Sequence, residues 1–352
     1  MTTRRGTTPA SGSELPSRRS TIEDVASEAG VSVATVSRAL RGLPNVAVST
    51  RQRISAVADR LQYTPDPAAS RLAIGRTQTV TVVVPTLSGW YFSTVVAGAE
   101  AVCAEAGYDV LVVGVGSHHD LGRILSESYS LERRTDGLVI VDIPIDPQQV
   151  ASISGRGVAI TTIGYATPGH PSIRIDNVDV GRIAAAHLID REHQRLGLIT
   201  GLIEDPLNFS VPRLRRSGFT DELERCGLEL DDRFVAHGNF GIDGGREALS
   251  ALLDLPEPPT AVFSISDEMA FGALMELGRR GLRPGRDIAI LGVDDHEFSQ
   301  VVALTTVRQP VADHGAAATR LLLEAMHRDE HEAGATESEV VAPVELVIRS
   351  TT

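Results

Sequence analysis

The sequence predicts an N-terminal all-α helix-turn-helix head with a hinge helix, followed by a two-lobed α/β body built on parallel sheets. Three short helical patterns with apolar residues at helical spacing occupy 20–65. From Thr79 onward, short and fully apolar runs alternate with amphipathic stretches, which is typical of parallel strands covered by helices on both faces. This alternation occurs in two successive series, which indicates two similar lobes.

The three predicted head helices each have a polar residue able to cap them. Ser20 or Thr21 can begin the first helix, which ends at Gly30, and Ser32 can begin the second. Ser49 or Thr50 is expected to open the third. The expected divisions of the chain are a disordered tail at 1–19, a helix-turn-helix domain at 20–65, a hinge helix or linker at 66–76 and the two-lobed domain at 77–352.

In the body, the apolar runs give the strands and the amphipathic stretches the helices. The expected strands are 80–84, 110–115, 137–141, 158–163, 196–200, 234–237, 261–265, 288–293 and a last one within 344–352. The expected helices are 93–106, 121–134, 179–191, 212–226, 243–254 and 267–280. Ligands of such sheets bind beyond the carboxyl ends of the strands, so the expected binding place is the cleft between the lobes.

Charge is divided unevenly along the 352 residues. All 33 basic side chains are Arg, and the net charge is −13. Residues 1–76 carry 11 Arg against 6 acids, a net of +5, whereas 77–352 carry 22 Arg against 40 acids, a net of −18. Phosphate binding depends on local potential, so a basic head on an acidic body is compatible with nucleic-acid binding.

Other features place the chain outside the membrane and secreted classes. No long apolar run predicts a membrane helix, and the polar, basic start does not resemble a secretory signal. Cys103 and Cys226, far apart in the sequence, predict neither a disulfide framework nor a zinc site. The expected location is therefore the cytoplasm, with no membrane partner.

The segment from Thr21 to Leu40 has the layout of a helix-turn-helix. Small Ala26 lets two helices approach and Gly30 permits the tight turn. The second helix then presents its N-terminal residues outward, where base edges are reached, and Arg38 can pair with guanine O6 and N7. The alternative is a plain three-helix bundle with a surface arginine.

The same segment, with Asn45, Ser49-Thr50-Arg51, Leu61 to Pro65 and the stretch to Leu72, resembles the DNA-binding head of the lac repressor (LacI/GalR) family, and the similarity continues nearly to Thr352. The resemblance implies a periplasmic-binding-protein-like body, a homodimer and a pseudopalindromic double-stranded operator. The DNA contacts expected from the motif and the resemblance are Ser32, Val33, Ala34, Thr35, Ser37, Arg38, Asn45, Ser49, Arg51 and Leu72, with Thr35, Ser49 and Arg51 suited to phosphates.

Hinge helices that fold on the DNA are also implied by the resemblance. Leu72 matches the position that wedges between central base pairs, and segment 66–74 is too short to form a stable helix alone. Pro67 departs from the small residue more usual there. The alternative is an ordinary linker with a buried leucine.

Several body residues are expected to contact a small-molecule effector, a carbohydrate. Trp90, Tyr91 and Phe92 form an aromatic cluster after the first strand, suited to the faces of sugars or a planar ring. The resemblance adds Arg215, Phe240 and Asp294, and Asp267 follows strand 261–265. A core position for Phe92, and a solvated or helix-capping role for Asp267, are the alternatives.

Two departures from the family pattern argue against a simple hexose as the effector, without excluding it. Ser266 stands where many sugar-responsive members carry Asn, and Gly164 stands where many carry an acid. Both replacements remove hydrogen bonds to adjacent hydroxyls.

An enzyme has little support in the sequence. No Gly-x-Ser-x-Gly, His-Glu-x-x-His or phosphate-binding Gly-x-x-x-x-Gly-Lys motif is present, and no cofactor is implied. His118-His119-Asp120 is interpreted as a polar loop and not a metal site, and Asp294-Asp295 as side chains on opposite faces of a strand. The alternative functions are a stand-alone solute-binding protein and a cleft enzyme on the same body. The expected function is an effector-controlled, DNA-binding transcription regulator, a repressor.

Overall fold

The computed structural model describes residues 20–64, 76–126, 129–201, 207–327 and 338–352. The chain divides into two compact units, Met1–Thr77 and Gln78–Thr352, which we call the head and the body. The expected tail at 1–19 and almost all of the expected hinge, including Pro67 and Leu72, lie outside the described residues. No helix of the described part is long and apolar enough to cross a membrane.

The head contains three helices, α1 (Ile22–Ala29), α2 (Val33–Leu40) and α3 (Val48–Arg60). Thr21 begins α1 through a reciprocal capping box with Asp24, and Gly30 ends it in the left-handed conformation with φ 64°. Helix α3 begins one or two residues before the expected start, with Ala47 as a cap that makes no side-chain hydrogen bond. The three helices enclose one small core whose buried members are Val25, Ala26, Ala29, Val36, Ala39, Ile54, Val57 and Ala58.

The first lobe of the body is built on a six-stranded sheet in the order β11-β5-β4-β3-β1-β2. All its pairings are parallel. Its strands are β1 (Thr79–Val84), β2 (Asp109–Gly114), β3 (Gly137–Val141), β4 (Ala159–Ile163), β5 (Ser172–Ile175) and β11 (Glu339–Ala342). Its helices are α5 (Trp90–Ala106), α6 (His118–Leu125), α7 (Pro147–Ser154) and α12 (Val311–His327).

The second lobe is built on a sheet in the order β12-β10-β9-β8-β6-β7, parallel except for β12 against β10. Its strands are β6 (Leu196–Thr200), β7 (Val235–His237), β8 (Ala261–Ser264), β9 (Ala289–Asp294), β10 (Thr305–Arg308) and β12 (Glu345–Val347). Its helices are α8 (Asn177–Asp190), α9 (Val211–Arg225), α10 (Ile242–Leu253) and α11 (Asp267–Arg280).

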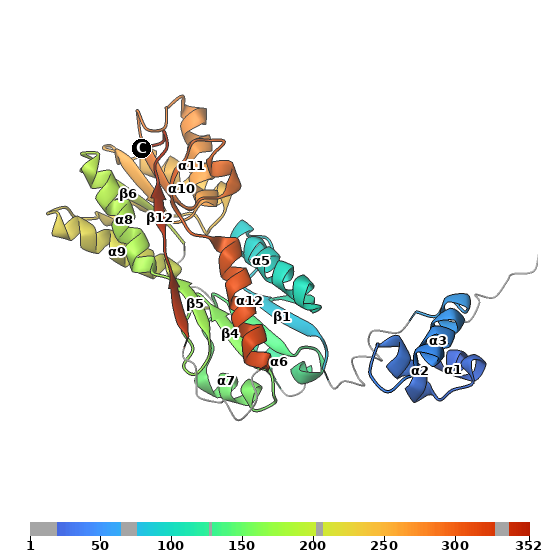
Figure 1. Ribbon diagram of the computed structural model, residues 1–352. Coiled ribbons are helices and arrows are strands. Elements are labelled where there is room, and N and C mark those ends of the chain that lie inside the picture. The colour runs from blue at the N-terminus through green and yellow to red at the C-terminus, as the bar shows by residue number, and fades with distance from the viewer. Residues whose placement is uncertain (1–19, 65–75, 127–128, 202–206, 328–337) are drawn as a thin grey trace, which may run out of the picture. The chain divides into compact units, whose positions relative to one another are not determined.

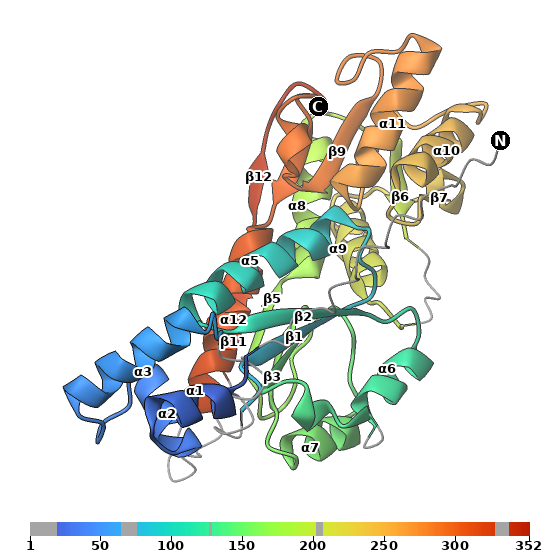
Figure 2. The same ribbon diagram turned by 90° about the vertical axis from the view of Figure 1, so that its right-hand side faces the viewer.

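Two successive series of strands and helices do not account for the whole body, because the chain returns to the first lobe after β10. Helix α12 buries Val311, Ala318 and Leu322 in the first-lobe core, and it lies beside α5 in both views (Figures 1 and 2). The close approach requires glycine, because a Cβ on Gly315 would lie 2.0 Å from the Val95 carbonyl oxygen. The connections β5 to α8, β10 to α12 and β11 to β12 therefore join the lobes.

Several local predictions need correction. The stretch expected as one helix at 121–134 contains α6 and a separate 3₁₀ turn at Leu131–Arg133, with 127–128 outside the described residues. His118 to Asp120 is not a loop but the first turn of α6, capped by Ser117. The last strand is short, since β12 covers three residues of the expected 344–352.

Candidate functional site

The exposed face of α2 is the candidate DNA-binding surface of the head. Ser32 caps the helix, and its hydroxyl accepts a hydrogen bond from the Thr35 backbone N–H at 3.2 Å. Val33 is 40% exposed and Ala34 and Arg38 are also exposed, while Val36 and Ala39 face the core. Thr35 and Ser37 are half-buried. The expected base-reading residues thus lie on the outward side of a helix that the core holds in place.

The expected DNA contacts that follow α2 differ from one another in their surroundings. Arg51 donates from Nη2 to the Leu43 carbonyl oxygen at 2.8 Å, so it holds the loop between α2 and α3. Asn45 lies in that loop in the left-handed conformation, with φ 70°. Ser49 is exposed in the first turn of α3. Arg51 therefore has a structural role that the sequence did not predict.

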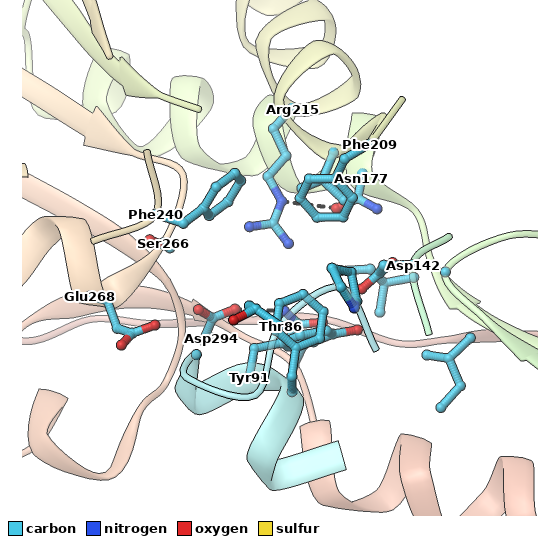
Figure 3. A pocket seen from close by; sticks show the side chains of 18 of the residues that line it. Thr86, Tyr91, Asp142, Asn177, Phe209, Arg215, Phe240, Ser266, Glu268 and Asp294 are labelled. Carbon is cyan, nitrogen blue, oxygen red and sulfur yellow. Dashed lines mark hydrogen bonds between the residues drawn. The ribbon is translucent and has the colours of Figure 1, made fainter. Parts of the chain in front are cut away.

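The body contains a cavity of about 410 Å³, lined by residues of both lobes. Five of the seven expected effector contacts line it: Tyr91, Phe92, Arg215, Phe240 and Asp294. Figure 3 shows the first-lobe residues Tyr91 and Asp142 across the cavity from Arg215 and Phe240 of the second lobe. The volume is in the range of small-molecule sites.

Arg215 of α9 is the central cation of the cavity. It is 4% exposed and donates from Nε to Asn177 Oδ1 at 2.8 Å, and from Nη1 to the Ile265 carbonyl oxygen. Burial lowers the pKa of the guanidinium, and the nearby carboxylates, Asp294 foremost, oppose that shift. Two of its donors are thus used to hold its orientation, and the rest of the guanidinium group faces the cavity (Figure 3).

Asp294, at the end of β9, is the second-lobe acid of the site. It is 7% exposed, and Gln309 Nε2 donates to its Oδ1 at 2.6 Å. Burial raises the pKa of this carboxyl, while Arg215 and the Gln309 hydrogen bond act in the other direction. Its neighbour Asp295 does not line the cavity and pairs with Arg308 and Arg349. The two carboxyl groups therefore have different partners, but Asp295 lies beyond the end of β9 with φ 55°, so strand alternation is not what separates them.

Aromatic rings lie on both sides of the cavity. Phe240 meets Phe209 edge to face, with ring centroids 5.4 Å apart. On the first lobe, Tyr91 and Phe92 make a similar pair at 5.2 Å. Phe92 also packs against the first-lobe core, so it belongs both to the cavity lining and to the edge of the core. Burial raises the pKa of the Tyr91 hydroxyl well above its usual value.

Two expected effector contacts do not line the cavity. Trp90 packs on His296 with ring centroids 4.5 Å apart. Asp267 is fully buried, and it accepts hydrogen bonds from the His296 backbone N–H and from the hydroxyls of Ser299 and Thr306. Ser266, not Asp267, caps α11. Asp267 is therefore neither solvated nor the cap of α11, and its hydrogen bonds are made within the protein.

Several lining residues are not predicted from the sequence: Thr86, Asp142, Asn177, Phe209, Glu268, Gln309 and His314. Asp142 had a usable signal, because it is the polar residue directly after the apolar run 137–141, as Asp294 is after its own strand. Gln309 and His314 have no such signal, because no local pattern in the sequence places the segment after β10 at the cleft. Among the described residues no cluster of His, Cys, Asp and Glu could hold a metal ion.

Comparison with known proteins agrees with this architecture. Residues 21–66 match the family described as bacterial regulatory proteins, lacI family, and 185–352 match a periplasmic binding protein-like domain. The chain is 33% identical to the HTH-type transcriptional repressor CytR of Escherichia coli over 336 residues, covering 94% of this chain and 96% of that protein.

Solved structures agree as well. The lac repressor dimer bound to operator and the anti-inducer ONPF matches with a TM-score of 0.81 at 27% identity, covering 95% of this chain and 99% of that one. The transcriptional regulator CelR–cellobiose complex matches with a TM-score of 0.66 at 28% identity, covering 95% and 100%. With its helix-turn-helix head and two-lobed binding body, the chain belongs to the lacI family of bacterial regulatory proteins.

Proposed function

We propose that this protein is a transcriptional repressor that binds a pseudopalindromic DNA operator as a homodimer. Its affinity for the operator rises or falls when a carbohydrate occupies the body cavity. The observation that carries the proposal is the cavity itself. It is lined from both lobes by aromatic rings and by a buried Arg215 opposite Asp294, a combination suited to hydroxyl groups and sugar faces.

The head supports the DNA half of the proposal. Helix α2 presents Val33, Ala34 and Arg38 to solvent, as a recognition helix must. Three relatives support repression, dimeric operator binding and a carbohydrate effector by analogy. CytR is named a repressor, the lac repressor was solved as a dimer on its operator, and CelR was solved with cellobiose.

The test begins with selection of binding sequences from a random duplex library by the full-length protein. Enriched sequences with two related half-sites, and an operator affinity that changes at least fivefold with a carbohydrate, would support the proposal. Enrichment without half-site symmetry would contradict dimeric operator binding. An operator affinity that no carbohydrate changes would contradict carbohydrate control.

A further inference from the structure

The first lobe contributes one acid to the cavity, Asp142, and its side chain can take this position only because residue 164 is glycine. Asp142 follows β3 and Gly164 follows the neighbouring strand β4, and the Asp142 backbone N–H donates to the Ile163 carbonyl oxygen at 2.8 Å. A Cβ on Gly164 would lie 1.8 Å from Asp142 Oδ1. The carboxyl group of Asp142 therefore fills the space that a side chain at 164 would take.

Asp142 is held in a costly position. It is 4% exposed, lies in the left-handed conformation with φ 53°, and forms no ion pair with any described residue. Burial raises the pKa of its carboxyl to about 7, and it outweighs the hydrogen bond to the Tyr91 side chain and the charge of Arg215, which both act in the other direction. A buried acid with so little compensation costs free energy, unless a ligand in the cavity supplies donors to it.

The charges around the cavity disfavour an anionic ligand. Three acids line it, Asp142, Glu268 and Asp294, against two arginines. Arg174 is paired with Glu339, and Arg215 already donates to Asn177 and Ile265 while lying near Asp294. A phosphate or carboxylate would thus meet three acidic groups against two arginines, of which one is paired with Glu339 and the other lies near Asp294.

His314 adds to the cavity lining a polar atom that has no hydrogen-bond partner among the described residues. It is 3% exposed and lines the cavity, and its Nε2 is buried with no hydrogen-bond partner in the described structure. Burial lowers its pKa to about 4, so the ring is neutral near pH 7. A neutral imidazole can hydrogen-bond a hydroxyl group but offers no charge to an anion.

We propose that Asp142, in the space left by Gly164, is the first-lobe residue that selects the effector, and that the effector is an uncharged polyhydroxylated compound and not its phosphate or carboxylate. The inference rests on the proposed effector control but concerns binding to the cavity alone. Hydroxyl groups of the ligand donate to Asp142 and Asp294, and Arg215 donates to ligand oxygens from the opposite lobe.

The first experiment is a thermal-shift screen of the full-length protein with matched sets. Each set holds a neutral compound with its phosphate or acid, such as glucose, glucose 6-phosphate and gluconate, ribose and ribose 5-phosphate, or cellobiose and cellobionate. We expect the midpoint to rise with a neutral member and not with its anionic counterparts. Larger shifts with the anions, or no shift with any neutral compound, would overturn the assignment.

The second experiment measures the dissociation constant of the responding compound by calorimetry. Asp142→Asn and Gly164→Ala should each weaken binding about tenfold or more, since the first removes the carboxylate and the second displaces it. Gly157→Ala is the matched control, because Gly157 has φ +77° but no atom within 4 Å of an added Cβ. Exposed Asp190, replaced by Asn, controls for loss of one negative charge. Unchanged affinity in both cavity variants would overturn the role of Asp142.

The outcomes separate this inference from the proposed function. If a neutral compound binds through Asp142 but leaves operator affinity unchanged, the effector control fails and the site assignment stands. If a compound controls operator binding and Asp142→Asn binds it equally well, the site assignment fails and the control stands.

Discussion

Asp267 provides a direct test of whether an acid that follows a strand binds a ligand or stabilises the fold. Its Oδ2 accepts hydrogen bonds from the His296 backbone N–H at 2.9 Å and from Ser299 Oγ at 2.6 Å, and its Oδ1 accepts from Thr306 Oγ1 at 2.8 Å. The side chain thus joins the start of α11 to the segment after β9 and to β10. We expect Asp267→Ala to destabilise the body strongly and Asp267→Asn to destabilise it little.

The magnitude follows from the three donors. A buried donor left without an acceptor costs about 1–3 kcal/mol, and the backbone N–H of His296 cannot rotate to find another. The Ser299 and Thr306 hydroxyls can rotate, and removing a buried acid recovers some desolvation free energy. We therefore expect Asp267→Ala to lower the free energy of unfolding by roughly 3 kcal/mol. Asp267→Asn keeps one oxygen for two donors and places its amide toward Thr306 Oγ1, so about 1 kcal/mol is expected.

The pH dependence provides a second signature. Burial, and then the charge of Asp294, raise the pKa of Asp267 above its unfolded value. The folded state therefore holds this proton more tightly than the unfolded state. The stability that Asp267 contributes is full below its unfolded pKa and is lost as the pH rises toward the folded value. Relative to Asp267→Asn, the unsubstituted protein should lose stability between about pH 4 and about pH 8.

Urea unfolding followed by tryptophan fluorescence measures this effect in the full-length protein. Trp90 is the only tryptophan and lies in the body, so the signal reports body unfolding without the head. A loss below about 1 kcal/mol in Asp267→Ala, together with loss of effector binding, would refute the structural role. Asp267 would then be the ligand contact that its strand-end position suggests.

Three further outcomes are expected. Arg38→Ala should weaken binding to the selected operator by about 1–3 kcal/mol in fluorescence anisotropy and relax selectivity at one guanine; equal binding would exclude α2 as the base-reading helix. Leu72→Ala should weaken operator binding and leave effector affinity unchanged, whereas full operator affinity would exclude a wedge in the minor groove. Effector affinity should rise with pH through about 7, because ionised Asp142 accepts hydrogen bonds on both oxygens and its protonated form does not. Calorimetry should show no such rise in affinity for the Asp142→Asn variant. The same rise in the variant would exclude Asp142 as its cause.

Local sequence patterns predicted the head and most of the strands, because those features depend on neighbours a few residues apart. The three head helices follow from capping residues and helical spacing, and Asp294 follows from the rule that sites lie at strand ends. The position of α12 does not follow from such patterns. Its apolar face is compatible with either lobe, and only packing against α5 assigns it to the first.

The aromatic run at 90–92 shows a second limit. These residues form the first turn of α5, where successive side chains are rotated by about 100°. Three in a row therefore cannot all face one cavity, and Trp90 points to His296 while Tyr91 and Phe92 line the site. Asp267 shows a third limit, since its partners lie 29 to 39 residues away in the chain.

Two contacts between the lobes lie next to the cavity, so ligand binding can change the arrangement of the lobes. Trp90, next to Tyr91 of the cavity, stacks on His296 of the second lobe. Tyr165, next to Gly164, accepts from the Ser210 backbone N–H at 2.9 Å and donates to the Asn208 carbonyl oxygen at 3.2 Å. Each of these two contacts is made by a residue next to a cavity-lining residue in the sequence. A ligand that moves Tyr91 or Asp142 also alters the free energy of these contacts, and only such a difference between lobe arrangements can shift their populations.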